Sequence, residues 1–264
     1  MRRRSCGIPV RLICRRPFAS CVAIDYSRRA PDYDAVRADD LTDRAFWLQG
    51  LIEVGEIQPR ERVLDLGAGT GRFSALLQTT NPVVALDRSA EMLAVARGKA
   101  SFPCIRGDGH ALPIRRGAVD VTLLVMVLQH LANPGAVLSE VARVSRRVVI
   151  ATVDLERRPK TILEEAFPSL LEVDRARFPR IDAIVADLTS AGFGRIRVEE
   201  RPYRRTFTVE QQLDRVRRKY LSTFDLLPPG EFEEGMRFLE REMAKRFGDR
   251  FELASNITFV AGTR

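Results

Sequence analysis

The sequence predicts an α/β protein with a doubly wound, seven-stranded, mostly parallel sheet, helices on both faces of that sheet, and a helical cap. Two observations carry this prediction. Short apolar segments of strand length alternate with longer segments of helical periodicity along most of the chain, a pattern typical of a parallel sheet covered by helices. A glycine-rich loop at 67–71 follows the first of these strands. The length of 264 residues suits one large domain.

The first half of the chain supplies a leading helix and then four strands with helices between them. The leading helix covers 41–57 and is ended by Pro59. Ser89 is a good N-cap for a helix over 90–100, and a shorter helix begins at 73–78. The predicted strands, each apolar and of strand length, are 62–66, 83–86, 104–106 and 120–127.

In the second half of the chain, the regular alternation of strands and helices ends after the fifth strand. A helix over 135–144 leads to that strand at 148–153, and a helix over 181–191 is closed by Gly192. We expect a sixth strand at 195–200 and an edge strand at 251–260. Helical segments around 157–178 and 205–248 are expected to form a cap over the carboxyl edge of the sheet. Right-handed crossovers complete the doubly wound topology.

The formal net charge of +8 is concentrated at one end of the chain. Residues 1–24 hold six arginines and no acid, whereas the remaining residues hold 37 basic and 35 acidic groups. We expect a disordered basic leader over 1–24, followed by a single folded domain over 25–264. The composition of the leader also resembles that of an organellar transit peptide. A further alternative is that residues 1–24 are upstream sequence that was included because the start of the protein was wrongly assigned.

Several classes of protein are excluded or disfavoured by composition. No apolar run approaches the roughly 20 residues of a membrane helix. Three of the four cysteines lie in the leader, with no CxxC spacing, so we expect no metal site and a cytoplasmic, reducing environment. The body is nearly neutral, which disfavours a nucleic-acid partner. Monomer and homodimer both stay open.

The loop Gly67-Ala68-Gly69-Thr70-Gly71 carries the functional signal. Glycine at alternate positions lets the backbone turn tightly and approach a ligand. A dinucleotide loop would read GxGxxG, but its sixth position here is Arg72. Asp65 precedes the loop and suits an ammonium group better than a pyrophosphate, while Asp87 lies where an acid can accept both hydroxyls of a ribose. The pattern favours a ligand with a ribose, a positive amino-acid end and no phosphates.

S-adenosylmethionine has these features, and four motifs in order strengthen the assignment. They are the loop with Asp65, the strand-end Asp87, the segment Gly107-Asp108-Gly109-His110-Ala111-Leu112-Pro113, and Leu128-Gln129-His130-Leu131. The chain here resembles the class I S-adenosylmethionine-dependent methyltransferases, most closely the small-molecule group that includes the ubiquinone-biosynthesis C-methyltransferases. The resemblance covers 25–152 firmly and implies a Rossmann-like methyltransferase fold, with S-adenosylhomocysteine as the product.

The resemblance also implies the cofactor-binding residues. It places Gly67, Ala68 and Gly69, with Gly71 completing the loop, under the methionine and ribose parts of S-adenosylmethionine. The other implied contacts are Asp65 near the amino group, Asp87 at the ribose, Arg88 and Met92 beside the adenine, Asp108 and Gly109 at its edge, and Val125 or Met126 at the sulfonium. Ordinary core packing is an equal alternative for Met92 and Met126. Tyr33 and Arg37 resemble a segment that closes over the cofactor carboxylate, with a surface loop as the alternative.

Methyl transfer is an in-line displacement, so alignment of the acceptor matters most and a base is needed only where the acceptor must lose a proton. The chain has two histidines, and His130 follows the fourth strand where the acceptor is expected. His130 is our candidate general base, and a histidine that ties this segment down is the alternative. Gln129 stands where some relatives carry their base, and it cannot act as one.

The acceptor is predicted to be a small organic molecule methylated on oxygen, nitrogen or carbon. The segment 125–128 lacks the N-P-P-Y pattern of amino methyltransferases. Seven cations against two acids between Arg201 and Lys219 imply an anionic acceptor if they face the pocket, and a solvated helix face otherwise. The alternatives are an RNA methyltransferase and a cofactor-binding module without catalysis.

Overall fold

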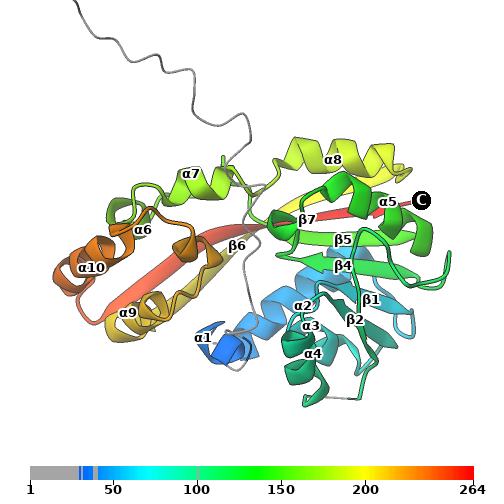
Figure 1. Ribbon diagram of the computed structural model, residues 1–264, viewed down its shortest axis with the longest axis horizontal. Helices are drawn as coiled ribbons and strands as arrows, with labels where there is room; N and C mark the ends of the chain where they lie inside the picture. The colour runs from blue at the N-terminus through cyan, green and yellow to red at the C-terminus, as the bar shows by residue number, and fades with distance from the viewer. Residues whose placement is uncertain (1–29, 31, 38–40, 100) are drawn as a thin grey trace, which may run out of the picture.

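The computed structural model describes residues 30, 32–37, 41–99 and 101–264. The predicted leader and its boundary at residue 24 lie outside the described residues. One seven-stranded sheet in the order β3-β2-β1-β4-β5-β7-β6 forms the body, and Figure 1 shows a second, helical lobe beside it. The fold class expected from the alternating pattern is confirmed.

The first five strands of the chain run parallel and agree closely with the prediction. They are β1 (Val63–Leu66), β2 (Val83–Asp87), β3 (Cys104–Arg106), β4 (Val121–Val125) and β5 (Arg147–Thr152). The strands β1 and β4 are buried along their whole lengths. The sequence of a strand that is buried on both faces is a continuous apolar run and does not alternate between apolar and polar residues. The short apolar runs in the sequence therefore predicted the positions of these strands well.

Two layers of helices enclose the sheet. The helices α5 (Pro134–Val144) and α8 (Ile181–Ser190) cover one face and share an apolar core with β4 and β5. The helix α2 (Leu41–Gly55) covers the other face, together with α3 (Arg72–Leu77). Ser89 caps α4 (Ala90–Arg97) by accepting a hydrogen bond from the Met92 amide, so the predicted N-cap is confirmed. Figure 1 shows these layers on opposite sides of the strands.

The last two strands correct the prediction. We expected 251–260 to be the edge strand, but β7 (Arg250–Thr263) lies between β5 and β6, and β6 (Arg195–Thr208) forms the edge. The physical reason is visible in the burial of β7, because residues 257–262 are all buried. The sixth strand is also much longer than the predicted 195–200, and it accommodates Pro202, a residue tolerated at a sheet edge.

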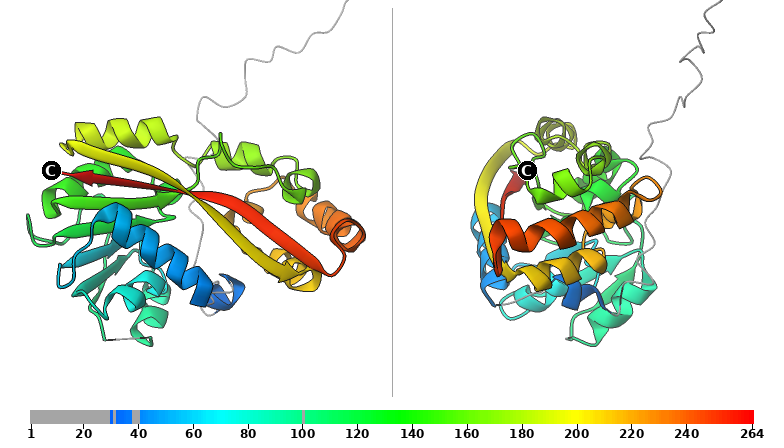
Figure 2. Two further views of the ribbon diagram at one scale, coloured as in Figure 1. Left: turned by 180° about the vertical axis from the view of Figure 1, so that it is seen from behind. Right: turned by 90° about the vertical axis from the view of Figure 1, so that its left-hand side faces the viewer.

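The pairing register of β7 explains how the body and the lobe are joined. β7 pairs with β5 only from Thr258 to Thr263, whereas it pairs with β6 along all 14 residues of each strand. Thr152, the last residue of β5, faces Thr258. The remaining part of the β6–β7 pair therefore continues beyond the carboxyl ends of the parallel strands. Figure 2 shows this twisted two-stranded ribbon running into the lobe.

The lobe has an apolar core of its own. It contains α6 (Ile162–Ala166), α7 (Leu170–Arg175), α9 (Val209–Arg217), the 3₁₀ turn η4 (Ser222–Asp225) and α10 (Glu231–Phe247). Phe167 and Phe224 are buried at its centre, with ring centroids 5.0 Å apart. Within the helical segment predicted around 205–248, α9 ends at Arg217. Lys219 has a φ of 49°, a left-handed conformation that does not continue a helix.

Close packing of α2 against β7 gives a testable prediction about stability. A Cβ atom on Gly50 would lie 2.3 to 2.8 Å from three ring atoms of the buried Phe259. We expect Gly50→Ala to lower the free energy of unfolding by about 1–3 kcal/mol because the ring cannot move aside in a packed core. Urea denaturation measures this change.

The matched control is Gly98→Ala at the C-cap of α4. Gly98 has a φ of −73°, and the nearest atom to an added Cβ is 3.4 Å away. Alanine fits this conformation, so its effect should be neutral or stabilising by up to about 1 kcal/mol. Equal losses in the two variants would contradict the packing argument.

Candidate active site

The glycine loop adopts the conformation that its sequence requires. Gly67, Gly69 and Gly71 have φ values of 75°, 55° and 71°, in the left-handed region that favours glycine. A Cβ on Gly67 would lie 2.6 Å from the Val127 side chain, whereas no atom of the described residues lies within 4 Å of a Cβ on Gly69. Gly67 thus permits close packing of the loop on the segment after β4, and the space in front of Gly69 is open to a ligand.

Asp87 ties this loop to the end of β2. Its Oδ2 accepts a hydrogen bond from the Gly69 amide at 2.8 Å, and its Oδ1 accepts one from the Ser89 amide at 2.9 Å. The neighbouring Ala68 is buried. The structure therefore brings the predicted loop and the predicted ribose acid together, and it holds the carboxylate of Asp87 at the edge of the open space before Gly69.

Asp65 lies behind the loop and not on its open side. Its side chain is 1% exposed, and its Oδ2 accepts hydrogen bonds from the Ser74 hydroxyl at 2.6 Å and the Ser74 amide at 3.1 Å. Burial raises the pKa of Asp65 to about 6, because desolvation disfavours the charged form. The structure thus assigns Asp65 a role in fastening α3 to β1, and its predicted approach to an amino group stays a prediction.

The predicted adenine side gathers after β2 and β3. Asp108 is exposed, and its Oδ1 accepts a hydrogen bond from the His110 amide at 2.9 Å and lies 2.8 Å from His110 Nδ1. These contacts hold the pKa of Asp108 below its usual range. Met92 is buried in α4, Arg88 is exposed, and a Cβ on Gly109 would lie 3.3 Å from Val137.

The segment after β4 has a strained backbone where the sulfonium is predicted to lie. Met126 has a φ of 55°, unusual for a residue with a side chain, and it follows the buried Val125. Its amide donates to the Ala151 carbonyl, and its carbonyl accepts from Gln129 Nε2, both at 2.8 Å. Backbone strain of this kind concentrates at functional sites. Gln129, which cannot be a base, thus acts as a clamp on Met126.

His130 lies in the 3₁₀ turn η3 (Leu128–His130), directly after this segment. Its Nδ1 is 3.4 Å from Nη2 of Arg177, a residue of the lobe that follows α7. Arg177 also donates to Ser222 Oγ at 3.0 Å and to Thr223 Oγ1 at 3.2 Å. The contact therefore links the end of β4 to the lobe, and sequence reasoning gave no signal for Arg177.

A short helix, α1 (Tyr33–Arg37), fastens onto the glycine loop. The Thr70 hydroxyl donates to Asp34 Oδ1 at 2.6 Å, and Asp34 also pairs with Lys99. Tyr33 is half-buried in this helix, and the side chain of Arg37 lies outside the described residues. The predicted closure of Tyr33 and Arg37 over the cofactor carboxylate stays a prediction, and sequence reasoning did not single out Asp34, the acid that contacts the loop.

The basic run of the lobe divides into two parts. Arg201, Arg204, Arg217, Arg218 and Lys219 form ion pairs with acidic side chains. Arg205 also lies 3.9 Å from Asp43 Oδ1. Arg205 and Arg215 line a cleft of about 920 Å³ between α3 and α9, and both guanidinium groups lie over the Phe207 ring. Of the predicted cofactor residues whose side chains the structure describes, none lines this cleft. The expectation that part of the run faces an acceptor stays a prediction.

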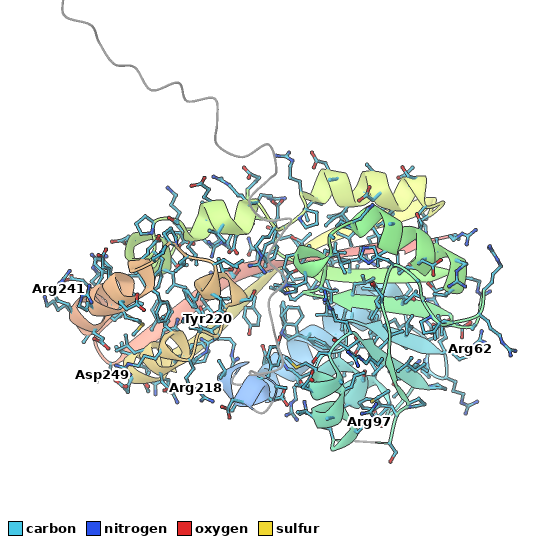
Figure 3. All side chains as sticks on the ribbon, viewed as in Figure 1. Arg62, Arg97, Arg218, Tyr220, Arg241 and Asp249 are labelled. Carbon is cyan, nitrogen blue, oxygen red and sulfur yellow. The ribbon has the colours of Figure 1, made fainter. Side chains whose placement is uncertain are left out.

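Two buried hydroxyls at the sheet edge were not predicted. Thr152 and Thr258 pair in register at the carboxyl end of β5, and neither buried hydroxyl has a hydrogen-bond partner among the described residues. Among the described residues, no group of three or more His, Cys, Asp or Glu side chains could hold a metal ion. Among the helices of the described residues, none is long and apolar enough to cross a membrane. Figure 3 shows all described side chains on the ribbon.

Comparisons with known proteins identify the family of this chain. Residues 64–150 match the family model described as a methyltransferase domain. The malonyl-[acyl-carrier protein] O-methyltransferase of Methylococcus capsulatus is 30% identical over 210 residues, which cover 72% of this chain and 74% of that protein. The enzyme of the same name from Serratia marcescens is 36% identical over 129 residues, covering 47% of this chain and 48% of its own length. The match thus spans about half of the Serratia protein.

Two solved structures share the fold at low identity. A protein described as a methyltransferase from an antibiotic biosynthesis pathway of Anabaena variabilis superposes with a TM-score of 0.69 at 20% identity, covering 85% of this chain and 98% of that one. Phosphoethanolamine N-methyltransferase 2 of Haemonchus contortus, solved with S-adenosyl-L-methionine, has a TM-score of 0.59 at 16% identity, covering 97% of this chain and 61% of that one.

The chain belongs to the class I S-adenosylmethionine-dependent methyltransferases. The four motifs that carry the resemblance fall within or beside the matched residues 64–150. The expected enzyme class and its cofactor, S-adenosylmethionine, are therefore confirmed at the level of the family. The contacts of individual residues with that cofactor stay predictions.

The buried carboxyl of Asp65 gives a prediction about pH. Its pKa in the folded state is about 6, above the ordinary value near 3.9 expected in the unfolded chain. Between about pH 4 and pH 6 the folded state therefore holds a proton that the unfolded state releases, and this group lowers stability as the pH rises through that window. Asp65→Asn removes this dependence and keeps an oxygen that can accept from Ser74.

We expect the stability of Asp65→Asn relative to the parent chain to increase by about 2 kcal/mol between pH 4 and pH 7.5. Urea denaturation at several pH values measures the difference. The control is Asp182→Asn, because the pKa of that exposed carboxyl is lowered by Arg180 and no such gain should follow. A stability difference for Asp65→Asn that does not change with pH would contradict the argument.

Proposed function

We propose that this chain transfers the methyl group of S-adenosylmethionine to oxygen, nitrogen or carbon of a small organic acceptor. The observation that carries the proposal is the left-handed glycine loop, which is open in front of Gly69 and hydrogen-bonded to the strand-end carboxylate of Asp87. Asp108 adds an exposed carboxylate to the half-buried one of Asp87. Acids in these places suit a positively charged nucleoside and oppose a ligand with phosphates.

The residues present fit the cofactor. In the proposed arrangement Gly67, Ala68 and Gly69 lie under its methionine and ribose parts, and Asp87 accepts from the ribose hydroxyls. Asp108 and Gly109 lie at the adenine, and Met126 lies beside the sulfonium. The bound cofactor supplies an already activated methyl group. The protein's part is to align the acceptor and to exclude water, and the position of the lobe beyond the carboxyl ends of the strands supports that role.

A small acceptor is favoured over RNA by the charges of the lobe. Six of the seven cations between Arg201 and Lys219 form ion pairs with acids of the same chain, so they offer a reduced field to a polyanion. Two of the relatives are named for O-methylation of a malonyl group on a carrier protein. These names support a small organic acceptor as the substrate class.

Cofactor binding is tested by thermal unfolding with S-adenosylhomocysteine. At one hundred times the dissociation constant, a ligand that binds only the folded state adds about 2.7 kcal/mol of stability. We expect this gain for the parent chain and for Asp182→Ala, an exposed acid remote from the loop. Asp87→Ala should lose it, because the loop and the ribose both lose their acceptor. The same gain in Asp87→Ala would contradict the assigned site.

Catalysis is tested by the formation of S-adenosylhomocysteine from S-adenosylmethionine. The acceptors are carboxylic acids including malonyl thioesters, phenols, quinols, amines and a structured RNA. We expect turnover with a small organic acceptor and none with RNA. Turnover with RNA alone would overturn the small-molecule assignment. Cofactor binding without turnover on any acceptor would favour a binding module without catalysis.

A further inference from the structure

The cleft between α3 and α9 collects cations from both of its walls. Its volume of about 920 Å³ lies within the range of sites that hold small molecules. Among the described residues that line it, five are cations and two are acids. The body contributes Arg44 of α2, Arg72 of α3 and Lys99, and the lobe side contributes Arg205 of β6 and Arg215 of α9. Figure 1 shows that α2 and α3 belong to the body and α9 to the lobe.

Helix α3 separates this cleft from the proposed cofactor site. Ser74 and Leu77 are buried on the inner side of the helix, where Ser74 donates to Asp65 of β1. Arg72 and Leu76 line the cleft on the other side. The cofactor itself carries a sulfonium cation, and the acids proposed to hold it stand at the glycine loop. A cleft rich in cations therefore suits a different ligand, one that carries negative charge.

Arg215 is held rigidly in the wall of the cleft. It is only 8% exposed, and its guanidinium carbon lies 4.0 Å from the centre of the Phe207 ring and 4.2 Å from that of the Tyr220 ring. Its Nη1 donates to Gln212 Oε1 at 2.7 Å. Because two rings and an amide already fix this guanidinium, it loses little conformational freedom when it binds an anion.

Chain partners also order the other cations of the cleft. Asp43 of α2 is 3% exposed, and its carboxylate joins the two walls. Its Oδ2 accepts from Arg72 Nη2 at 3.1 Å, and its Oδ1 lies 3.9 Å from Arg205 Nη1. Lys99 pairs with Asp34. A guanidinium has five N–H donors, so it can bind a chain carboxylate and an anionic ligand at the same time.

We propose that this cleft binds a small molecule with two or more linked phosphate groups, and that the bound molecule ties the lobe to the body. The planar fork of an arginine matches the oxygens of a phosphate. Linked phosphates carry anionic oxygens that point in several directions, so they reach cations on both walls. A single carboxylate presents two oxygens in one plane, to one wall. The site is separate from the proposed methyl transfer and does not depend on it.

Binding is tested by isothermal titration calorimetry of the full chain with phosphate, pyrophosphate and tripolyphosphate. All titrations use one ionic strength, because salt screens such attractions. We expect the affinity to rise at least about tenfold from phosphate to tripolyphosphate, since only the longer ligands reach both walls. No binding of tripolyphosphate, or equal affinity for all three ligands, would overturn the proposal. A single-stranded RNA that binds where tripolyphosphate does not would overturn the small-molecule class.

Variants of the two walls locate the ligand. Arg44→Gln removes an exposed cation of the body, and Arg205→Gln removes one of the lobe side. Each should weaken tripolyphosphate binding about tenfold, the effect of losing one hydrogen bond to a charged group. The matched control is Arg217→Gln in α9, where the arginine pairs with Glu210 and Glu240. An equal loss in Arg217→Gln would show general charge attraction and contradict the site. Thermal unfolding checks that each variant folds.

Hydrogen exchange tests the bridge between the body and the lobe. Tripolyphosphate should slow amide exchange both in α2 and α3 and in α9, because one ligand contacts both walls. Protection of one wall alone would contradict the bridge. S-adenosylhomocysteine should bind equally well with the cleft saturated, and mutual exclusion of the two ligands would contradict a separate site. Failure of the proposed function looks different, because S-adenosylhomocysteine then does not stabilise the chain while tripolyphosphate still binds.

Discussion

The antiparallel pairing of β7 is the constraint on which the rest of the structure depends. Six of its residues complete the sheet beside β5, and all fourteen pair with β6. Because β7 pairs with β6 over more residues than with β5, the β6–β7 ribbon extends past the carboxyl ends of the parallel strands. The lobe therefore lies on the side of the sheet where the glycine loop and His130 are found. The Arg177 to His130 contact exists only because this ladder sets the distance between the body and the lobe.

At the carboxyl edge, the body supplies carboxylates and the lobe supplies a buried cation. Asp87 and Asp108 stand where a positively charged cofactor is proposed, whereas Arg177 lies 3.4 Å from His130 at the end of β4. Acids at the proposed cofactor site favour a cation, and desolvation would strengthen that attraction.

Much of the body was predictable because its signals are local. A strand buried on both faces, a serine N-cap and glycines at alternate positions each depend on residues within a few positions of one another, and Ser89 and Gly69 confirm such predictions. The errors concern strand pairing. Nothing local distinguished β7 as an interior strand, although Pro202 in β6 was an available sign of a sheet edge. Asp34 and Arg177 were missed because their partners lie 36 and 47 positions away in the chain.

The sequence by itself determined the family, the cofactor and the loop that is proposed to hold it, since those motifs are contiguous and each residue type is required by its own backbone or chemistry. Only the tertiary structure decided the strand order, the burial of Asp65 behind the loop, and the cation that faces His130. These features depend on the register of long-range pairings and on the desolvation that packing imposes. The few residues that fix such a register are distributed over the whole second half of the chain.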